Sequence, residues 1–410
     1  MNFDGFQDHC PSCCSFSANE EKGDITVIPR EMIENIFEFL SLEEVLELCN
    51  KRILKRLPCD KNFWIYTAQR LNLPIEEILI KAIRRNYIGV IDSLLQIDDI
   101  IINYQEREDP WNPVLLVAAQ IGNIEVVESL LGMRGINVNL RNKHGNTPLI
   151  AAALRDNLDV VNRLLEVDKI DVNLQDDNGN IALMLAVLNP TGIVSLPVVD
   201  RLVDIIDVNH QNNDGDTALM MAAMRRDNLP VVNRLLQEDN ININLRNNEG
   251  KTALMAAAKM NNLPVVDRLL REDNINVNLQ DDNELTALMI AAYTGNVDIL
   301  DRLLAKDVTN VNFKNDNGTT ALMLAVKRSN IEVVESLLQE NTINVNLQND
   351  DGDTALMMVA FTGNMDILNR LLAKDGININ LLNNEGETAL MEAEDRDYSE
   401  IVALLCEFGG

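Results

Sequence analysis

The sequence has few aromatic residues, no long apolar run and no obvious leader. Aromatic residues make up 4% of the 410 residues, although 46% are hydrophobic, so a core must be built from aliphatic side chains. No run approaches the roughly 18 apolar residues that a membrane-spanning helix needs. The first residues lack the basic region and apolar stretch of a signal peptide. We therefore expect a soluble protein in the cytoplasm.

Positive charge is scarce as well. The chain has 35 Lys and Arg against 64 Asp and Glu, which gives a net charge of −29. Nucleic-acid binding depends largely on Lys and Arg that neutralise phosphates. This charge balance disfavours DNA and RNA as partners.

The chain also lacks the residue clusters that most metal and catalytic sites need. Its 6 cysteines are too few and too unevenly spaced for a disulfide framework, which favours a reducing compartment. Cys10 and Cys13 have C-x-x-C spacing and Cys14 follows, but no second pair completes a zinc site. Modification of these cysteines stays open. We expect no metal or other cofactor.

Catalytic motifs are absent too. The sequence has 3 histidines, and His144 and His210 fall in the turns of a repeated segment described next. There is no Gly-rich phosphate loop, nucleophile elbow or H-E-x-x-H pattern. We expect a protein that is not an enzyme.

A segment related to G-x-T-A-L-M recurs from Gly145 almost to the C-terminus. Its third position is occupied, at intervals of 34 to 36 residues, by Thr147, Ile181, Thr217, Thr252, Thr286, Thr320, Thr354 and Thr388. With less regular copies upstream, about nine or ten units cover residues 75–410. The chain is therefore a tandem array over most of its length.

One unit predicts a turn, two helices and an extended return. Gly250 stands where a tight turn needs positive φ, and Thr252 can cap the helix that follows. Asn262 is the expected N-cap of a second helix, with Pro264 in its first turn. Both helices carry one apolar stripe, so neighbouring units must stack to bury them.

This pattern, G-x-T-x-L-x-x-A-A followed by V-V-x-x-L-L and V-N, resembles the ankyrin repeat. The resemblance implies an all-α fold with an ankyrin-repeat solenoid. Most units have T-A-L-M where that family usually has T-P-L-H. We expect the methionines that replace the usual His to lie in the core: Met184, Met220, Met255, Met289, Met323, Met357 and Met391.

Two units are irregular. The unit at Ile181 contains an insertion from Leu188 to Pro197, which is either a tolerated loop or a functional one, and its return loop is shortened. In the unit at Thr286, Glu284 stands where glycine is expected, which predicts a strained or altered turn.

The segment before the repeats divides into two parts. Residues 1–24 are polar and irregular, which predicts disorder. Residues 25–74 predict three short helices, with Ser41 capping the second. They resemble an F-box domain through Ile28-Pro29-x-Glu31-Met32-Ile33, Ile36-Phe37-x-x-Leu40, Glu44-Val45 and Asp60-x-x-Phe63-Trp64.

The F-box resemblance implies docking on a Skp-type adaptor, which links such proteins to cullin-RING machinery. The residues expected to bind the adaptor are Ile28, Pro29, Ile33, Ile36, Phe37, Leu40, Val45 and Trp64. The alternative is that these helices only cap the first repeat, because an open solenoid needs a covered end.

By analogy with the ankyrin fold, two positions of each first helix face the concave groove. The residues expected to bind a target there are Leu185, Leu188, Met221, Met224, Lys259, Ile290, Tyr293, Lys327, Met358 and Phe361. This stripe, with acidic turn residues beside it, suits a protein partner with an apolar anchor and basic surroundings. The alternative is partial burial of the stripe between adjacent repeats.

The two resemblances together imply the substrate-recognition subunit of an SCF-type cullin-RING ubiquitin ligase, acting as a monomer. The alternative is a non-enzymatic ankyrin scaffold or inhibitor. The same arrangement also resembles proteins that intracellular bacteria and large DNA viruses place in host cells. The identity of the target stays open, because specificity lies in surface residues on a common scaffold.

Overall fold

A computed structural model of the chain describes residues 40–50, 59–106, 111–188 and 196–409. Within these ranges the regular structure consists of 22 helices, with no strand longer than an isolated bridge. The predicted all-α class is confirmed for this part of the chain. The chain divides into two compact units, residues 1–100 and 101–410.

The first unit contains four helices: α2 (Leu42–Asn50), α3 (Lys61–Leu71), α4 (Ile75–Arg84) and α5 (Ile88–Leu95). As predicted, Ser41 caps α2: its Oγ accepts from the Glu44 N–H at 3.4 Å, and the Glu44 carboxylate accepts from the Ser41 N–H at 2.9 Å. Asp60 caps α3 by accepting from the Phe63 N–H at 3.0 Å. Helix α2 packs on α5, and α3 packs on α4 and α5.

A disulfide joins Cys49 at the end of α2 to Cys59, just before α3. The sequence spacing gave no reason to pair these two cysteines. Cys406 is free and exposed. The other cysteines, Cys10, Cys13 and Cys14, lie outside the described residues, as do the predicted disordered segment and the first predicted helix up to Phe39.

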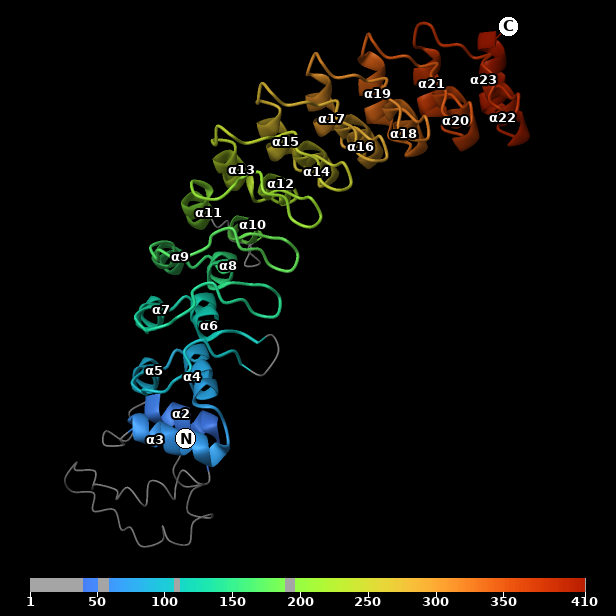
Figure 1. The fold of residues 1–410 in the computed structure, drawn as a ribbon. Coiled ribbons are helices and arrows are strands. Elements are labelled where there is room, and N and C mark those ends of the chain that lie inside the picture. Colours follow the sequence, from blue (N-terminus) through green and yellow to red (C-terminus); the bar gives the residue numbers. More distant parts are fainter. Residues whose placement is uncertain (1–39, 51–58, 107–110, 189–195, 410) are drawn as a thin grey trace, which may run out of the picture. The chain divides into compact units, whose positions relative to one another are not determined.

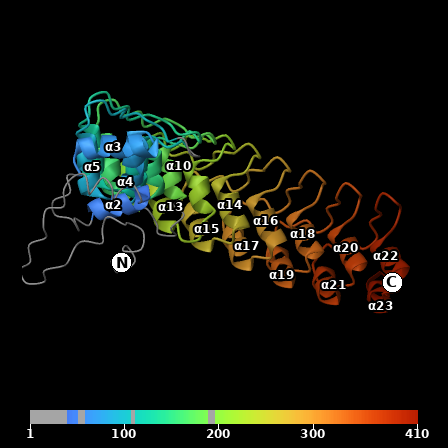
Figure 2. The ribbon, with the colours of Figure 1, turned by 90° about the horizontal axis from the view of Figure 1, so that it is seen from below.

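The second unit is a row of helix pairs. The first helices of the pairs are α6 (Val114–Ile121), α8 (Pro148–Leu154), α10 (Ala182–Val187), α12 (Ala218–Ala223), α14 (Ala253–Lys259), α16 (Ala287–Thr294), α18 (Ala321–Lys327), α20 (Ala355–Thr362) and α22 (Ala389–Asp395). The second helices are α7 (Ile124–Leu131), α9 (Leu158–Leu165), α11 (Leu196–Val203), α13 (Leu229–Leu235), α15 (Leu263–Leu269), α17 (Val297–Leu304), α19 (Ile331–Gln339), α21 (Met365–Leu372) and α23 (Ser399–Gly409). The even- and odd-numbered helices form two parallel rows (Figures 1 and 2), and the even-numbered row follows the inner side of the curve (Figure 1).

The turn and cap of each unit follow the predicted pattern. Gly250 has φ of 75°. The Thr252 hydroxyl accepts from the Met255 N–H at 3.3 Å, and in the reverse direction the Thr252 N–H donates to the Met255 sulfur at 3.5 Å. Thr hydroxyls also cap the other first helices from α8 onward, except α10, which follows Ile181, whereas α6 follows Pro113 and has no side-chain cap.

The methionine of each T-A-L-M segment lies in the core, with one exception. Six of the seven, from Met184 to Met357, are at most 2% exposed. Met391 is 47% exposed because, among the described residues, no further helix pair covers α22. The expected core role therefore holds only where a following repeat supplies the other half of the core.

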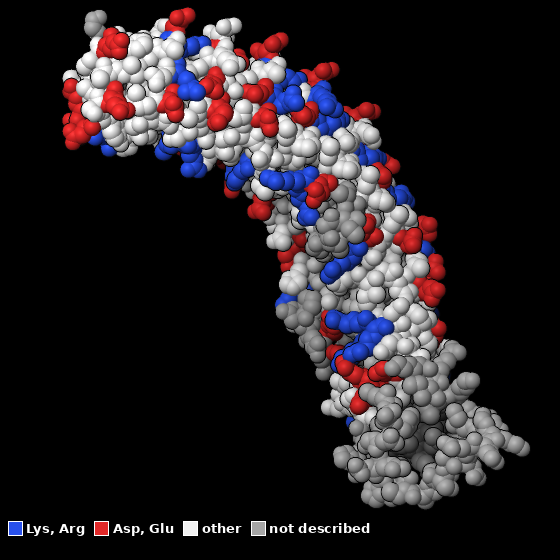
Figure 3. Space-filling model, turned by 180° about the vertical axis from the view of Figure 1, so that it is seen from behind, with Lys and Arg blue, Asp and Glu red and all other residues white. Residues whose placement is uncertain are grey.

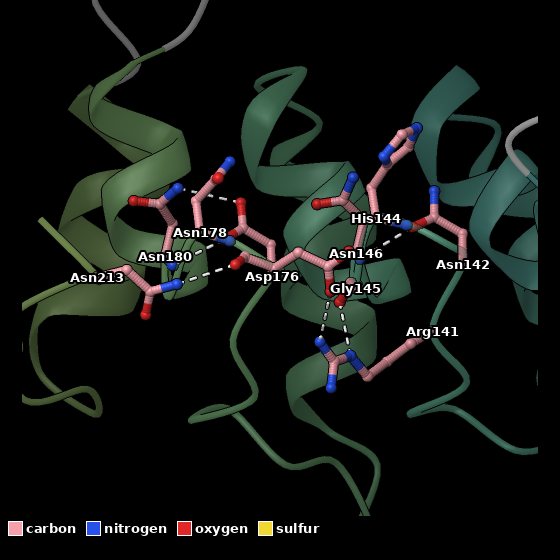
Figure 4. Close-up of polar contacts among 10 residues, drawn as sticks. Arg141, Asn142, His144, Gly145, Asn146, Asp176, Asn178, Asn180 and Asn213 are labelled. Atoms are coloured by element: carbon pink, nitrogen blue, oxygen red, sulfur yellow. Dashed lines mark hydrogen bonds and ion pairs between the residues drawn. The ribbon is translucent and has the colours of Figure 1, made fainter.

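Neighbouring turns are joined by backbone hydrogen bonds. The Asp177 N–H donates to the His144 carbonyl of the preceding turn at 3.0 Å, and the Asn213 N–H donates to the Asn178 carbonyl at 2.9 Å. Each turn is also closed internally, for example by the Asn142 side chain, which accepts from the N–H groups of His144 and Asn146. Figure 4 shows these polar residues running from one turn to the next.

Asparagines in the return segments form a second series of contacts between repeats. The Asn244 amide donates to the Asn274 carbonyl at 2.7 Å and accepts from the Asn276 N–H at 2.8 Å. The same pair of bonds is made by Asn103, Asn139, Asn209, Asn278, Asn312 and Asn346. Asn173, which precedes the unit with the shortened return loop, makes no such pair. Each bond contributes about 1 kcal/mol.

Asn262 has a different role from the one predicted. It stands at the N-cap position of α15, but its side chain does not bond the helix. Instead its Nδ2 donates to the carbonyls of Ala223 and Arg225, each at 3.0 Å, at the end of α12 in the preceding repeat. The residue thus supplies a donor to the carbonyl at the C-terminus of α12 and to a second carbonyl just beyond it, where helix geometry leaves carbonyls without partners inside the helix.

The two irregular units depart from the pattern as their sequences predict. Ile181 has no hydroxyl and makes no side-chain cap. The insertion lies mostly outside the described residues. Glu284 has φ of 57°, the left-handed conformation that glycine has in most other turns. The hydrogen bond from the Asp316 N–H to Asn283 at that turn is 3.2 Å long, compared with 2.9–3.1 Å at the other turns.

We predict that Glu284→Gly raises the free energy of unfolding by about 1 kcal/mol, because the left-handed conformation costs a residue with Cβ roughly 1–2 kcal/mol. Urea unfolding followed by circular dichroism would measure this, and amide exchange at Asp316 would locate the effect. Gly250→Ala serves as the opposite control. It should destabilise the protein, because the new Cβ would lie 2.7 Å from the Asp282 nitrogen. An unchanged or lower stability of Glu284→Gly would contradict the proposed strain.

Candidate binding groove

The two positions predicted to face the groove lie in or just after the first helices, which follow the inner side of the curve (Figure 1). We call the residue four places after the capping Thr the floor position and the residue seven places after it the edge position. At the floor, Leu185, Met221 and Leu324 are 6–8% exposed, and Ile290 and Met358 are half-buried. These side chains are therefore largely or partly buried.

The edge positions are open to solvent. Met224 is 37% exposed, Tyr293 45% and Phe361 51%, and Lys259 and Lys327 are also exposed. Leu188 is half-buried. From Met224 to Phe361 the edge therefore presents a row of large apolar and basic side chains, one from each of five consecutive repeats.

Arginines cover the two aromatic rings at the edge. The guanidinium of Arg328 lies 4.0 Å from the centre of the Tyr293 ring, and that of Arg396 lies 3.4 Å from the centre of the Phe361 ring. Each arginine comes from the end of the next first helix, so the contact also ties two repeats together. The sequence analysis did not identify Arg328 or Arg396 as groove residues.

A cavity of about 460 Å³ opens between α12 and α14. It is bounded by the ends of both helices and by the turns that precede them. Its lining residues are Asp214, Asp216, Met220, Met224, Asn247, Asn248, Glu249, Lys251, Thr252, Ala256, Lys259 and Met260. Ala256 occupies the floor position, where most other repeats have Leu, Ile or Met, and its small side chain leaves this space unfilled.

The charges around the cavity are arranged on two sides. Lys251 contacts Glu249, and this hydrogen bond, followed by the charges of Lys251 and Lys259, lowers the pKa of the Glu249 carboxyl. On the other side, Asp216 accepts from the Asn247 amide at 2.8 Å. Neither Asp214 nor Asp216 forms an ion pair with any described residue.

Charge is patterned along the whole row of repeats. Figure 3 shows Lys and Arg gathered in patches between acidic and uncharged surface, although Asp and Glu outnumber them in the sequence. Lys259 and Lys327 are exposed at the ends of α14 and α18. The groove therefore offers a partner charges of both signs.

The residues predicted to bind an adaptor are only partly described. Ile28, Pro29, Ile33, Ile36 and Phe37 lie outside the described residues. Leu40 is 7% exposed, and Val45 and Trp64 are fully buried. The Trp64 indole N–H also donates to the Cys59 carbonyl at 3.2 Å. These three side chains lie in the interior of the first unit rather than on its surface.

Within the described residues, no group of three or more His, Cys, Asp and Glu side chains is placed to hold a metal ion. The His210 ring contacts the Gly179 carbonyl at 2.9 Å, as part of a turn. None of the described helices has the length and apolar character to cross a membrane.

Comparison with known families gives one match. The model described as ankyrin repeats, three copies, matches residues 115–196, 183–281, 273–349 and 341–410. These segments contain all the predicted groove residues. A search of curated proteins finds no significant match.

The last floor position is occupied by Glu392, whose pKa is raised by burial and then by the nearby Glu387 carboxylate. A raised pKa in the folded state means that ionisation of Glu392 opposes folding at neutral pH. We predict that Glu392→Gln has a higher melting temperature than the wild type at pH 7. The difference should disappear as the pH falls below the ordinary pKa of a glutamate, where both states of the wild type are protonated.

Thermal unfolding between pH 3.5 and 8 would measure the pH dependence of this difference. Glu394→Gln, which changes an exposed carboxylate of the same helix, is the matched control and should show no such dependence. A Glu392→Gln effect that is constant across the pH range would disprove the assignment.

Proposed function

We propose that this chain, which belongs to the ankyrin repeat family, holds a target protein on its repeats and presents it to a ubiquitin ligase. The observation that carries the target-binding part is the row of exposed large side chains at the edge positions, from Met224 to Phe361. Exposed apolar side chains in a regular row are typical of a protein-binding surface. Ankyrin repeats in general serve as protein-interaction modules.

The ligase part of the proposal rests on the F-box resemblance of residues 28–64. In this role the N-terminal segment docks on a Skp-type adaptor, with Ile28 to Phe37 as the contact. The chain itself transfers nothing. It would raise the effective concentration of the target near the ubiquitin carrier, which replaces a bimolecular encounter by a local one. The mechanism is the same for a eukaryotic receptor and for an effector placed in a host cell.

A scaffold without a ligase partner is the second candidate, and the packing of the first unit favours it. Helices α2 and α3 pack on α4 and α5 and bury Val45 and Trp64. This arrangement is what a cap on the first repeat requires. A cap formed by α2 and α3 does not exclude adaptor binding through residues 28–37, which lie outside the described residues.

Co-purification with a Skp-type adaptor distinguishes the two candidates. We predict that the full chain binds the adaptor and that Ile33→Asp together with Phe37→Asp abolishes binding, because the charges oppose burial in an apolar contact. Asn35→Asp with Glu38→Gln is the control for two changes in the same segment, and it should bind. Leu40 is left unchanged, because it is buried and its carbonyl accepts from Arg70. Absence of binding by the wild type would leave the scaffold function.

A further inference from the structure

The cavity between α12 and α14 is lined both by methionines and by two aspartates, Asp214 and Asp216, which form no ion pair with any described residue. We infer that it receives the side chain of an arginine or lysine of the target protein. This inference names the chemistry of the target and so rests on the target-binding part of the proposed function. It does not depend on the ligase part.

The methionines that line the cavity fit the aliphatic part of a long side chain. Met220 is buried, whereas Met224 and Met260 are 37% and 44% exposed. Thioether side chains are flexible and polarisable and adapt to the shape of a partner. The methylene groups of arginine and lysine are the part of a basic side chain that packs against such a surface.

The charged end of the side chain finds its partners at the turn before α12. Asp214 and Asp216 both line the cavity. Asp216 uses one carboxylate oxygen to accept from Asn247, which leaves the other available. Neither aspartate has an ion-pair partner among the described residues. A cation in the cavity would supply one, and hydrogen bonds between charged groups are the stronger kind.

The two lysines of the cavity do not favour an acidic side chain over a basic one. Lys251 is engaged by Glu249, and Lys259 also acts on that carboxylate. One of the two lysines is therefore paired within the protein, whereas neither aspartate has an ion-pair partner among the described residues. The net charge of −29 on the chain acts in the same direction, because it attracts a basic partner.

The size of the cavity is set by Ala256. A cavity of about 460 Å³ falls within the range of roughly 300–1,000 Å³ of sites that enclose a ligand, so it can hold a side chain together with adjoining backbone. Leu185 and Leu324 occupy the equivalent positions of α10 and α18. Leucine is thus compatible with the fold at this position, and Ala256→Leu should fill the cavity without unfolding the repeat.

The test uses the full chain labelled with ¹³C at the methionine methyl groups, without adaptor. The probe is the peptide acetyl-Ala-Leu-Arg-Leu-Ala-amide, compared with the same peptide carrying norleucine or glutamate in place of arginine. Met224→Leu and Met260→Leu assign the two reporter signals. We expect saturable shifts of these signals with the arginine peptide, and at least tenfold weaker binding of the other two peptides.

Two variants and one control complete the test. Ala256→Leu and the double variant Asp214→Asn, Asp216→Asn should each lower the affinity for the arginine peptide at least tenfold. The amide at position 216 can still accept from Asn247, so the turn is preserved. Glu332→Gln, which removes an exposed carboxylate of α19 that does not line the cavity, should bind like the wild type. Melting temperatures of all variants check the fold.

The inference is overturned if the norleucine or glutamate peptide binds as tightly as the arginine peptide. It is equally overturned if the double variant binds the arginine peptide like the wild type. Adaptor binding is measured separately, so its failure would remove the ligase function and leave the cavity result unaffected. If the arginine peptide does not bind to a chain that still binds the adaptor, the inference about a basic side chain in the cavity is wrong and the ligase function is unaffected.

Discussion

The second unit depends on hydrogen bonds that satisfy the polar groups of one repeat with those of the next. Most of its helices have six to eight residues, and such short helices leave many backbone carbonyls and N–H groups without partners inside the helix. Asn262 donates to two carbonyls at and just beyond the end of a helix in the preceding repeat, and Asn244 joins consecutive return segments. The apolar stripes then meet at a fixed distance. Stacking of neighbouring repeats therefore both buries the apolar stripes and provides hydrogen-bond partners for the backbone. A single repeat can do neither.

This fixed spacing makes the groove a set of equivalent positions whose chemistry changes one residue at a time. Leu324 fills its floor position, whereas Ala256 leaves a cavity at the equivalent place. Tyr293 carries a covering arginine at its edge position, whereas Lys259 stands beside acidic turn residues. The scaffold supplies regular positions and the individual side chains supply specificity, which explains how a repeated sequence can present a surface that is not repeated.

The first unit illustrates a limit of motif reasoning. The F-box pattern and a helical cap both require apolar residues at helical spacing, so the pattern does not separate residues that bind a partner from residues that form the core. Val45 and Trp64 match the motif and are buried against the first unit's own helices. The Trp64 indole has its hydrogen-bond partner at Cys59, inside the same unit. Any adaptor contact therefore has to come from other residues of the segment.

The sequence by itself determined the repeat, its two helices, the capping threonines and the position of the turns, because all of these depend on residues close together in the chain. It also identified the abnormal turn at Glu284, since a single glycine was missing from a regular pattern. The tertiary structure decided which side chains are exposed and which carboxylates have partners, because both depend on the neighbouring repeat about 34 residues away. The role of Asn262, the arginines over Tyr293 and Phe361, and the cavity beside Ala256 arise only when two repeats are stacked. The alanine at position 256 was visible in the sequence as a departure from Leu, Ile and Met, but only the stacked helices showed that nothing else fills the space.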